Sequence, residues 1–119
     1  MPSSVNIALV PVDGDLDVTT VPVVRRRIDR LVAGGCRRLF VNMADVGYVD
    51  SAGLGLILTE VRRMRSAGGL LSLINVSDQV YQALRRMRVL DHMAVRRAKG
   101  GPRVASLDPS VLPRWRMTF

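Results

Sequence analysis

The chain has 119 residues, 48% of them hydrophobic, which fits one globular domain with a single core. No apolar run approaches the ~20 residues of a membrane-spanning helix, and the first residues lack the pattern of a signal peptide. We therefore expect a cytoplasmic protein without membrane insertion.

The net charge is +8, from 18 basic and 10 acidic residues. The arginines are scattered over three predicted helices, and aromatic residues make up only 4% of the chain, too few for evident base-stacking platforms. We expect no direct binding of nucleic acid. Cys36 and His92 are the only cysteine and histidine, so a disulfide within the chain is excluded, and no metal site or cofactor is expected.

The first third of the chain predicts a strand, a turn and a helix. Residues 5–12 are rich in Val, Ile and Leu and predict a buried strand. A turn over residues 13–17 follows, and Thr19 or Thr20 is suited to cap the next helix. The core face of that helix has apolar residues at i, i+4 and i+7: Val24, Ile28 and Leu31. Gly34-Gly35 ends the helix.

The middle of the chain repeats this order. Residues 38–43 predict a second strand, which a polar loop through Asp45 and Gly47 connects to a helix ending near Ala67. The apolar face of that helix has the expected spacing: Leu54, Ile57, Leu58 and Val61. Its first residue would lie at or just after Ser51.

The last predicted elements are a strand over residues 70–76, a helix capped by Ser77 and a short strand over residues 93–97. Three apolar positions of the helix should face the core: Val80, Leu84 and Met87. Strands that alternate with helices predict an α/β fold with a mostly parallel sheet of about four strands and right-handed crossovers.

Sites in such folds lie at the carboxyl ends of the strands. The loops after the first two strands should meet there and bring five aspartates near Ser51: Asp13, Asp15, Asp17, Asp45 and Asp50. We interpret them as an acidic docking rim; the alternative is that they only form turns.

Ser51 is predicted at a helix N-terminus, where unpaired N–H groups and the helix dipole favour an anion. Its hydroxyl could accept a phosphoryl group, which adds roughly −1.5 to −2 charge. The simpler alternative is that Asp50 or Ser51 is only an N-cap, worth about 1 kcal/mol.

Three enzyme motifs fail around this serine. Leu54 stands where a phosphate-binding loop has lysine, and Leu58 where a dinucleotide fingerprint has glycine. Val49 stands where a nucleophile elbow has glycine. We therefore expect no enzyme, and we expect Gly53 and Gly55 to permit close approach of a neighbouring strand or a docked partner.

Asp50-Ser51-Ala52-Gly53-Leu54-Gly55 is similar to the Asp-Ser-Ser/Thr-Gly-Leu-Gly signature of anti-sigma factor antagonists, the STAS-domain family. Gly14-Asp15-Leu16-Asp17 resembles the Gly-Glu-Leu-Asp stretch of the same family, and the resemblance covers about residues 5–97. It implies a single STAS-like domain at 1–99. Residues 100–119 would form a tail interrupted by Gly and Pro, which docks on the sheet or a helix or marks a partner contact.

The resemblance implies partner switching. The unphosphorylated form binds an anti-sigma factor, often itself a serine kinase, and frees a sigma factor. Phosphorylation of Ser51 ends binding, and a phosphatase restores it. The residues implied in partner binding are Asp15, Asp17, Asp50, Ser51, Ala52, Gly53, Leu54 and Gly55. The alternative is a scaffold, or a soluble subunit of a lipid-transport ATPase complex, that phosphorylation does not switch.

Two features depart from the family pattern. Ala52 replaces the usual second hydroxyl residue, so an auxiliary hydroxyl is lost while Ser51 keeps the acceptor. The family has an extra strand before the one predicted at residues 5–12, so either this strand is absent here or the start lies upstream. The oligomeric state stays open.

Overall fold

Strands and helices alternate along the chain in the computed structural model, which describes residues 7–98. The elements are β1 (Ile7–Pro11), α1 (Val21–Ala33), β2 (Arg38–Asn42), α2 (Ser51–Ser66), β3 (Leu70–Val76), α3 (Asp78–Arg86), the 3-10 turn η1 (Leu90–His92) and β4 (Ala94–Arg97). The predicted α/β class is confirmed. The expected tail at 100–119 and the start of the first predicted strand lie outside the described residues.

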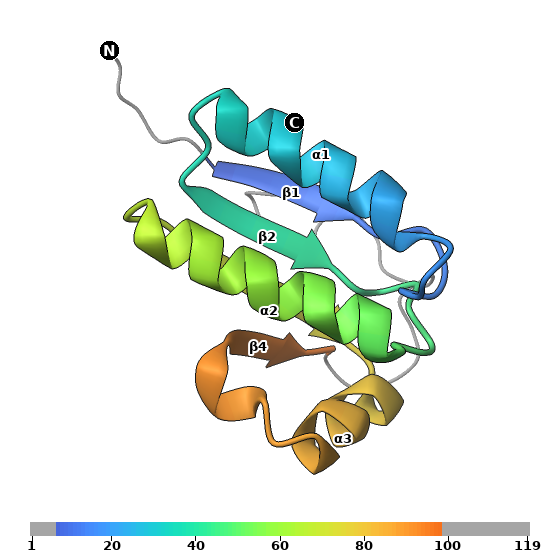
Figure 1. Cartoon of the computed structure of the whole chain (residues 1–119). Coiled ribbons are helices and arrows are strands. Elements are labelled where there is room, and N and C mark those ends of the chain that lie inside the picture. Colours follow the sequence, from blue (N-terminus) through green and yellow to red (C-terminus); the bar gives the residue numbers. More distant parts are fainter. Residues whose placement is uncertain (1–6, 99–119) are drawn as a thin grey trace, which may run out of the picture.

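The four strands form one parallel sheet in the order β1-β2-β3-β4, so every strand pairs with the next one in sequence. Each β–α–β crossover therefore steps in the same direction. Because such crossovers are right-handed, they place the helices on one face of the sheet. Figure 1 shows α1 and α2 lying side by side over that face, with α3 next to β4.

One core lies between the sheet and the helices. Val10, Val41 and Leu73 are partners in neighbouring strands and are all buried. Each helix packs one apolar face against these strand residues. The buried residues of the three helix faces include Val24, Ile28, Ile57, Val61, Val80 and Leu84. Leu31 is half-buried and packs against the same cluster. The helical periodicity thus identified the core-facing side of all three helices.

Two local predictions were wrong. Met87 is 41% exposed rather than part of the core, because α3 ends at Arg86 and Arg88 adopts a positive φ of 59° that turns the chain away. Thr20 occupies the N-cap position of α1 but makes no side-chain cap bond. Its hydroxyl instead donates to the Asp15 carbonyl at 2.7 Å and thereby supports the loop after β1.

The helix ends follow from glycine and from short polar residues. Ser77 caps α3 by accepting a hydrogen bond from the Val80 N–H at 3.2 Å. Gly35 and Gly68, which follow α1 and α2, have φ of 100° and 80°, a conformation that favours glycine.

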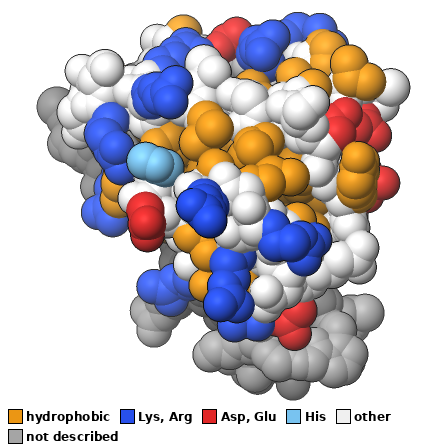
Figure 2. Space-filling model, turned by 60° about the horizontal axis from the view of Figure 1, so that its bottom comes forward, with side chains coloured by type: hydrophobic (Ala, Val, Ile, Leu, Met, Phe, Trp, Pro, Cys, Tyr) orange, Lys and Arg blue, Asp and Glu red, His pale blue; other side chains and the backbone are white. Residues whose placement is uncertain are grey.

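Exposed arginines lie on all three helices, among them Arg25, Arg62 and Arg85. Figure 2, in which the bottom of Figure 1 is turned forward, shows Arg side chains around a central group of apolar side chains. Within residues 7–98, no helix combines the length and the hydropathy that a bilayer span requires.

Candidate functional site

Ser51 is the first residue of α2, and its side chain is exposed where the loop after β2 enters the helix. Within residues 7–98, no hydrogen bond engages its hydroxyl. The cap is Asp50, whose Oδ1 accepts the Gly53 N–H at 2.8 Å. Of the two cap candidates, the aspartate therefore caps the helix, and the serine hydroxyl remains available at the surface.

Asp50 has a second structural task. Its Oδ2 accepts a hydrogen bond from the Val18 N–H at 3.0 Å, which fixes the start of α2 to the loop between β1 and α1. One carboxylate thus holds both the helix N-terminus and a neighbouring loop. The position of Ser51 depends on this residue because Ser51 follows it directly.

The loops after β1 and β2 are joined by a short parallel bridge between Leu16 and Val49. Leu16 donates to the Tyr48 carbonyl at 3.0 Å and accepts from the Asp50 N–H at 3.2 Å. Asp15 adds a side-chain bond, since its Oδ1 accepts the Gly47 N–H at 3.1 Å. The two loops therefore form one continuous surface at the carboxyl edge of the sheet.

Gly53 is buried beneath this surface. A Cβ on Gly53 would lie 2.3 Å from the carbonyl oxygen of Leu16, a distance that no side chain tolerates. The glycine is needed because the β1–α1 loop passes directly over the first turn of α2. This contact within the chain explains Gly53 without a partner.

Gly55 differs from Gly53. It is exposed, and a Cβ there would meet no atom within 4 Å. Glycine inside a helix costs about 1 kcal/mol relative to alanine, and the described part of the chain contains no contact that requires it. The absence of a side chain leaves the α2 backbone open beside Leu54, which is half-buried.

The predicted acidic rim is assembled in part. Asp15, Asp17 and Asp50 lie on the joined loops, whereas Asp13 lies 3.8 Å from Arg27 of α1. Asp45 is exposed in the loop before α2.

Among these aspartates, the Asp17 carboxylate accepts the largest number of hydrogen bonds. Its Oδ1 accepts from the hydroxyl of Thr19 at 2.6 Å and from the backbone N–H groups of Thr19 and Thr20. The Thr19 hydroxyl is the main reason that the pKa of Asp17 is lowered. Asp17 therefore carries its negative charge at neutral pH, close to the first turn of α2.

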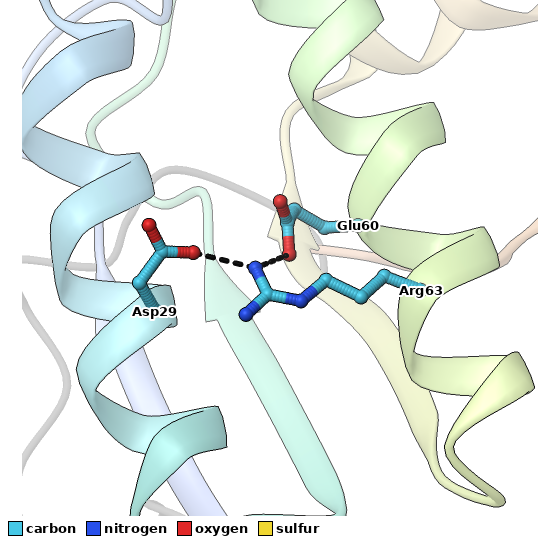
Figure 3. A network of polar contacts seen from close by, with 3 residues as sticks. All are labelled: Asp29, Glu60 and Arg63. Carbon is cyan, nitrogen blue, oxygen red and sulfur yellow. Dashed lines mark hydrogen bonds and ion pairs between the residues drawn. The ribbon is translucent and has the colours of Figure 1, made fainter.

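A polar network between α1 and α2 was not predicted. Glu60 lies on the apolar face of α2 and is only 2% exposed. Arg63 bridges it, at 3.2 Å, to Asp29 of α1 (Figure 3). A glutamate beside Val61 on the core stripe, with arginine three residues later, was the available sequence signal.

The chain matches the family described as STAS domain over residues 1–106. It is 35% identical over 71 residues to the anti-sigma-B factor antagonist of Staphylococcus aureus (strain NCTC 8325 / PS 47), covering 60% of this chain and 66% of that protein. The protein of the same name from Bacillus subtilis (strain 168) is 36% identical over 76 residues, or 64% of each chain. The matched part of this chain thus spans slightly less than two thirds of both relatives.

The fold is also similar to that of the Bacillus cell fate determinant SpoIIAA in its phosphorylated form. The TM-score is 0.60 with 21% sequence identity, over 80% of this chain and 86% of that chain.

Proposed function

Because this chain belongs to the STAS-domain family, we propose that it is an anti-sigma factor antagonist that acts by partner switching. The unphosphorylated chain binds an anti-sigma factor of the serine-kinase type, and that binding frees a sigma factor. Phosphorylation of Ser51 ends the complex, and a phosphatase restores it. The observation that carries the proposal is the exposed, unengaged Ser51 hydroxyl on a helix turn whose cap is supplied by Asp50.

The position suits a phosphoryl acceptor. Because Ser51 itself caps nothing, its hydroxyl can be modified without breaking a hydrogen bond of the fold. The first N–H groups of α2 and the helix dipole then face the new negative charge. Phosphorylation at this position is therefore compatible with an intact domain.

The same charge is unfavourable in a complex. A phosphoryl group on Ser51 would stand beside Asp50 and near Asp17, and both carboxylates already carry hydrogen bonds from the β1–α1 loop. A partner that covers this surface must desolvate the dianion among these acids, which costs free energy. Phosphorylation thus weakens the complex with the partner and leaves the fold of the domain unchanged.

The α2 backbone supports docking at the same end of the helix. Gly55 is exposed and has no neighbour that a Cβ would meet, one turn after Ser51. A partner that approaches the backbone here would account for a glycine that destabilises the free helix. Leu54 and Ala52, both half-buried, would border that contact.

Phosphoryl transfer tests the proposal directly. The purified chain would be mixed with ATP and each serine-kinase anti-sigma factor of its host, and phosphopeptides would be mapped. Phosphate on Ser51 is expected, and it should be absent from Ser51→Ala and retained in Ser66→Ala. Ser66 is the matched control because it is an exposed serine at the other end of α2.

Binding of the same variants separates the switch from a constitutive scaffold. Ser51→Ala should bind the anti-sigma factor even in the presence of ATP. Ser51→Asp and Ser51→Glu should bind roughly 10- to 100-fold more weakly, or about 1.4–2.8 kcal/mol. If both mimics bind like the wild type and no kinase transfers phosphate, the chain is a scaffold or a transport-complex subunit of the same fold.

A further inference from the structure

The sheet has a second face, opposite the helices. Side chains alternate along each strand, so the residues between the core positions point to the other side. They align in three rows across the first three strands: Ile7, Arg38 and Leu70; Leu9, Phe40 and Ser72; Pro11, Asn42 and Ile74. Within residues 7–98, the core cluster places α1, α2 and α3 on the first face.

This second face is largely apolar. Ile7 and Leu70 are 40% and 44% exposed and are among the large apolar residues of the described chain that remain exposed. Leu9 and Phe40 are half-buried. Ile74 is only 4% exposed although it does not belong to the helix-side core cluster. Parallel sheets are normally covered on both faces, so this apolar surface requires a cover.

We propose that the carboxyl-terminal segment of the same chain, residues 111–119, covers the second face of the sheet. From Pro113 to Phe119 its sequence alternates apolar and polar side chains in the period of an extended strand, and Leu112 is the one exception to the pattern. One side would carry Val111, Pro113, Trp115, Met117 and Phe119, and the other side Leu112, Arg114, Arg116 and Thr118. The apolar side contacts the sheet, and the arginines face solvent.

The connection is long enough. The Ala98 N–H donates to the Val76 carbonyl at 2.8 Å, so the chain leaves the sheet at the carboxyl end of β3. Residues 99–110 intervene and can span about 40 Å when extended. Four strands at ~4.8 Å spacing are only about 15 Å wide, so the segment can reach β1.

The second face also lies away from the proposed partner surface. Ser51 belongs to a helix on the first face, whereas Leu70 and Phe40 belong to the second. This inference is therefore independent of the proposed function. Loss of the terminal contact should leave phosphorylation of Ser51 unchanged.

Trp115 is the only tryptophan of the chain, so its fluorescence reports on this segment alone. In the full-length wild type, we expect a blue-shifted emission maximum and acrylamide quenching several-fold below that of free tryptophan. Leu70→Arg and Ile7→Arg should shift the emission to the red and restore quenching. The matched controls Val23→Arg and Met87→Arg change helix-side residues that are 42% and 41% exposed and should leave emission unchanged.

Circular dichroism would confirm that each variant is folded. Strong quenching of Trp115 in the wild type, or equal red shifts in test and control variants, would overturn the proposal. A dilution series with light scattering identifies the other occupant. If protection of Trp115 disappears together with a dimer, the segment covers the sheet of a second copy and the intramolecular contact is wrong.

Discussion

At the scale of single residues, Gly53 and Gly55 show that two glycines in one helix turn can have different causes. Gly53 lies under the Leu16 carbonyl, whereas Gly55 faces open space. The fold therefore requires glycine at position 53 and does not require it at position 55. Substitution by alanine should therefore change stability in opposite directions.

We predict that Gly53→Ala destabilises the domain by about 1–3 kcal/mol, because the new methyl group overlaps the Leu16 backbone and forces it to move. Gly55→Ala should stabilise it by up to about 1 kcal/mol through helix propensity. Urea unfolding of both variants measures the difference. A stabilised Gly53→Ala would mean that the β1–α1 loop does not pass over α2 as closely as described.

The pH dependence of stability should include a contribution from Asp17. Its folded pKa is lowered, first by the Thr19 hydroxyl. The contribution is therefore fully present above the unfolded pKa of about 3.9 and is lost as pH falls through the lower folded value. In Thr19→Val, the Asp17 pKa should rise toward its ordinary value. A carboxyl NMR titration checks this, with Thr59→Val on the exposed side of α2 as the control; an unchanged Asp17 pKa in Thr19→Val contradicts it.

At the scale of elements, α1 and α2 are connected by a charge network as well as by apolar contacts. Glu60 is buried, and Arg63 lies between it and Asp29 (Figure 3). The Arg63 side chain is 39% exposed, so solvent weakens its attraction for both carboxylates. Its main contribution to stability is the hydrogen bond that it donates to the buried carboxylate of Glu60.

We predict that Arg63→Met destabilises the domain by about 2 kcal/mol, because Glu60 loses the hydrogen bond from Arg63 while remaining buried. The double variant Glu60→Leu with Arg63→Met should recover most of that loss. Thermal unfolding measures both, with the exposed neighbour variant Arg62→Met as the control. A double variant no more stable than Arg63→Met would show that Glu60 is not the cause.

The sequence patterns predicted these elements well where each pattern was local. Residues 70–76 and the cap at Ser77 are observed as expected, because strand composition and capping residues act over a few positions. Met87 was misplaced because periodicity continued past the end of α3. The Leu16–Val49 bridge and the Glu60 network depend on residues far apart in sequence, and a single sequence does not show which distant residues meet.

At the scale of the whole molecule, the topology separates three surfaces. The carboxyl edge carries Ser51 next to the joined loops, the helices carry exposed arginines, and the second sheet face is largely apolar. Hydrogen bonds of Asp50 and Leu16 connect the two loops at the carboxyl edge. A charge added at Ser51 therefore lies next to a surface that these hydrogen bonds already hold in place. A change there should alter recognition more than folding.

We therefore predict that phosphorylation of Ser51 abolishes partner binding while it shifts the melting temperature by less than about 5 °C. The α2 N-terminus stabilises the phosphate by about 0.3–1 kcal/mol, and repulsion from Asp50 and Asp17 opposes this by a similar amount. For a domain of this size, 1 kcal/mol corresponds to roughly 4–8 °C. Calorimetry and binding assays on the same phosphorylated and unphosphorylated samples measure both quantities. A fall of the melting temperature by more than about 10 °C would mean that phosphorylation ends binding by unfolding the domain. Repulsion at an intact site would then be the wrong explanation of the switch.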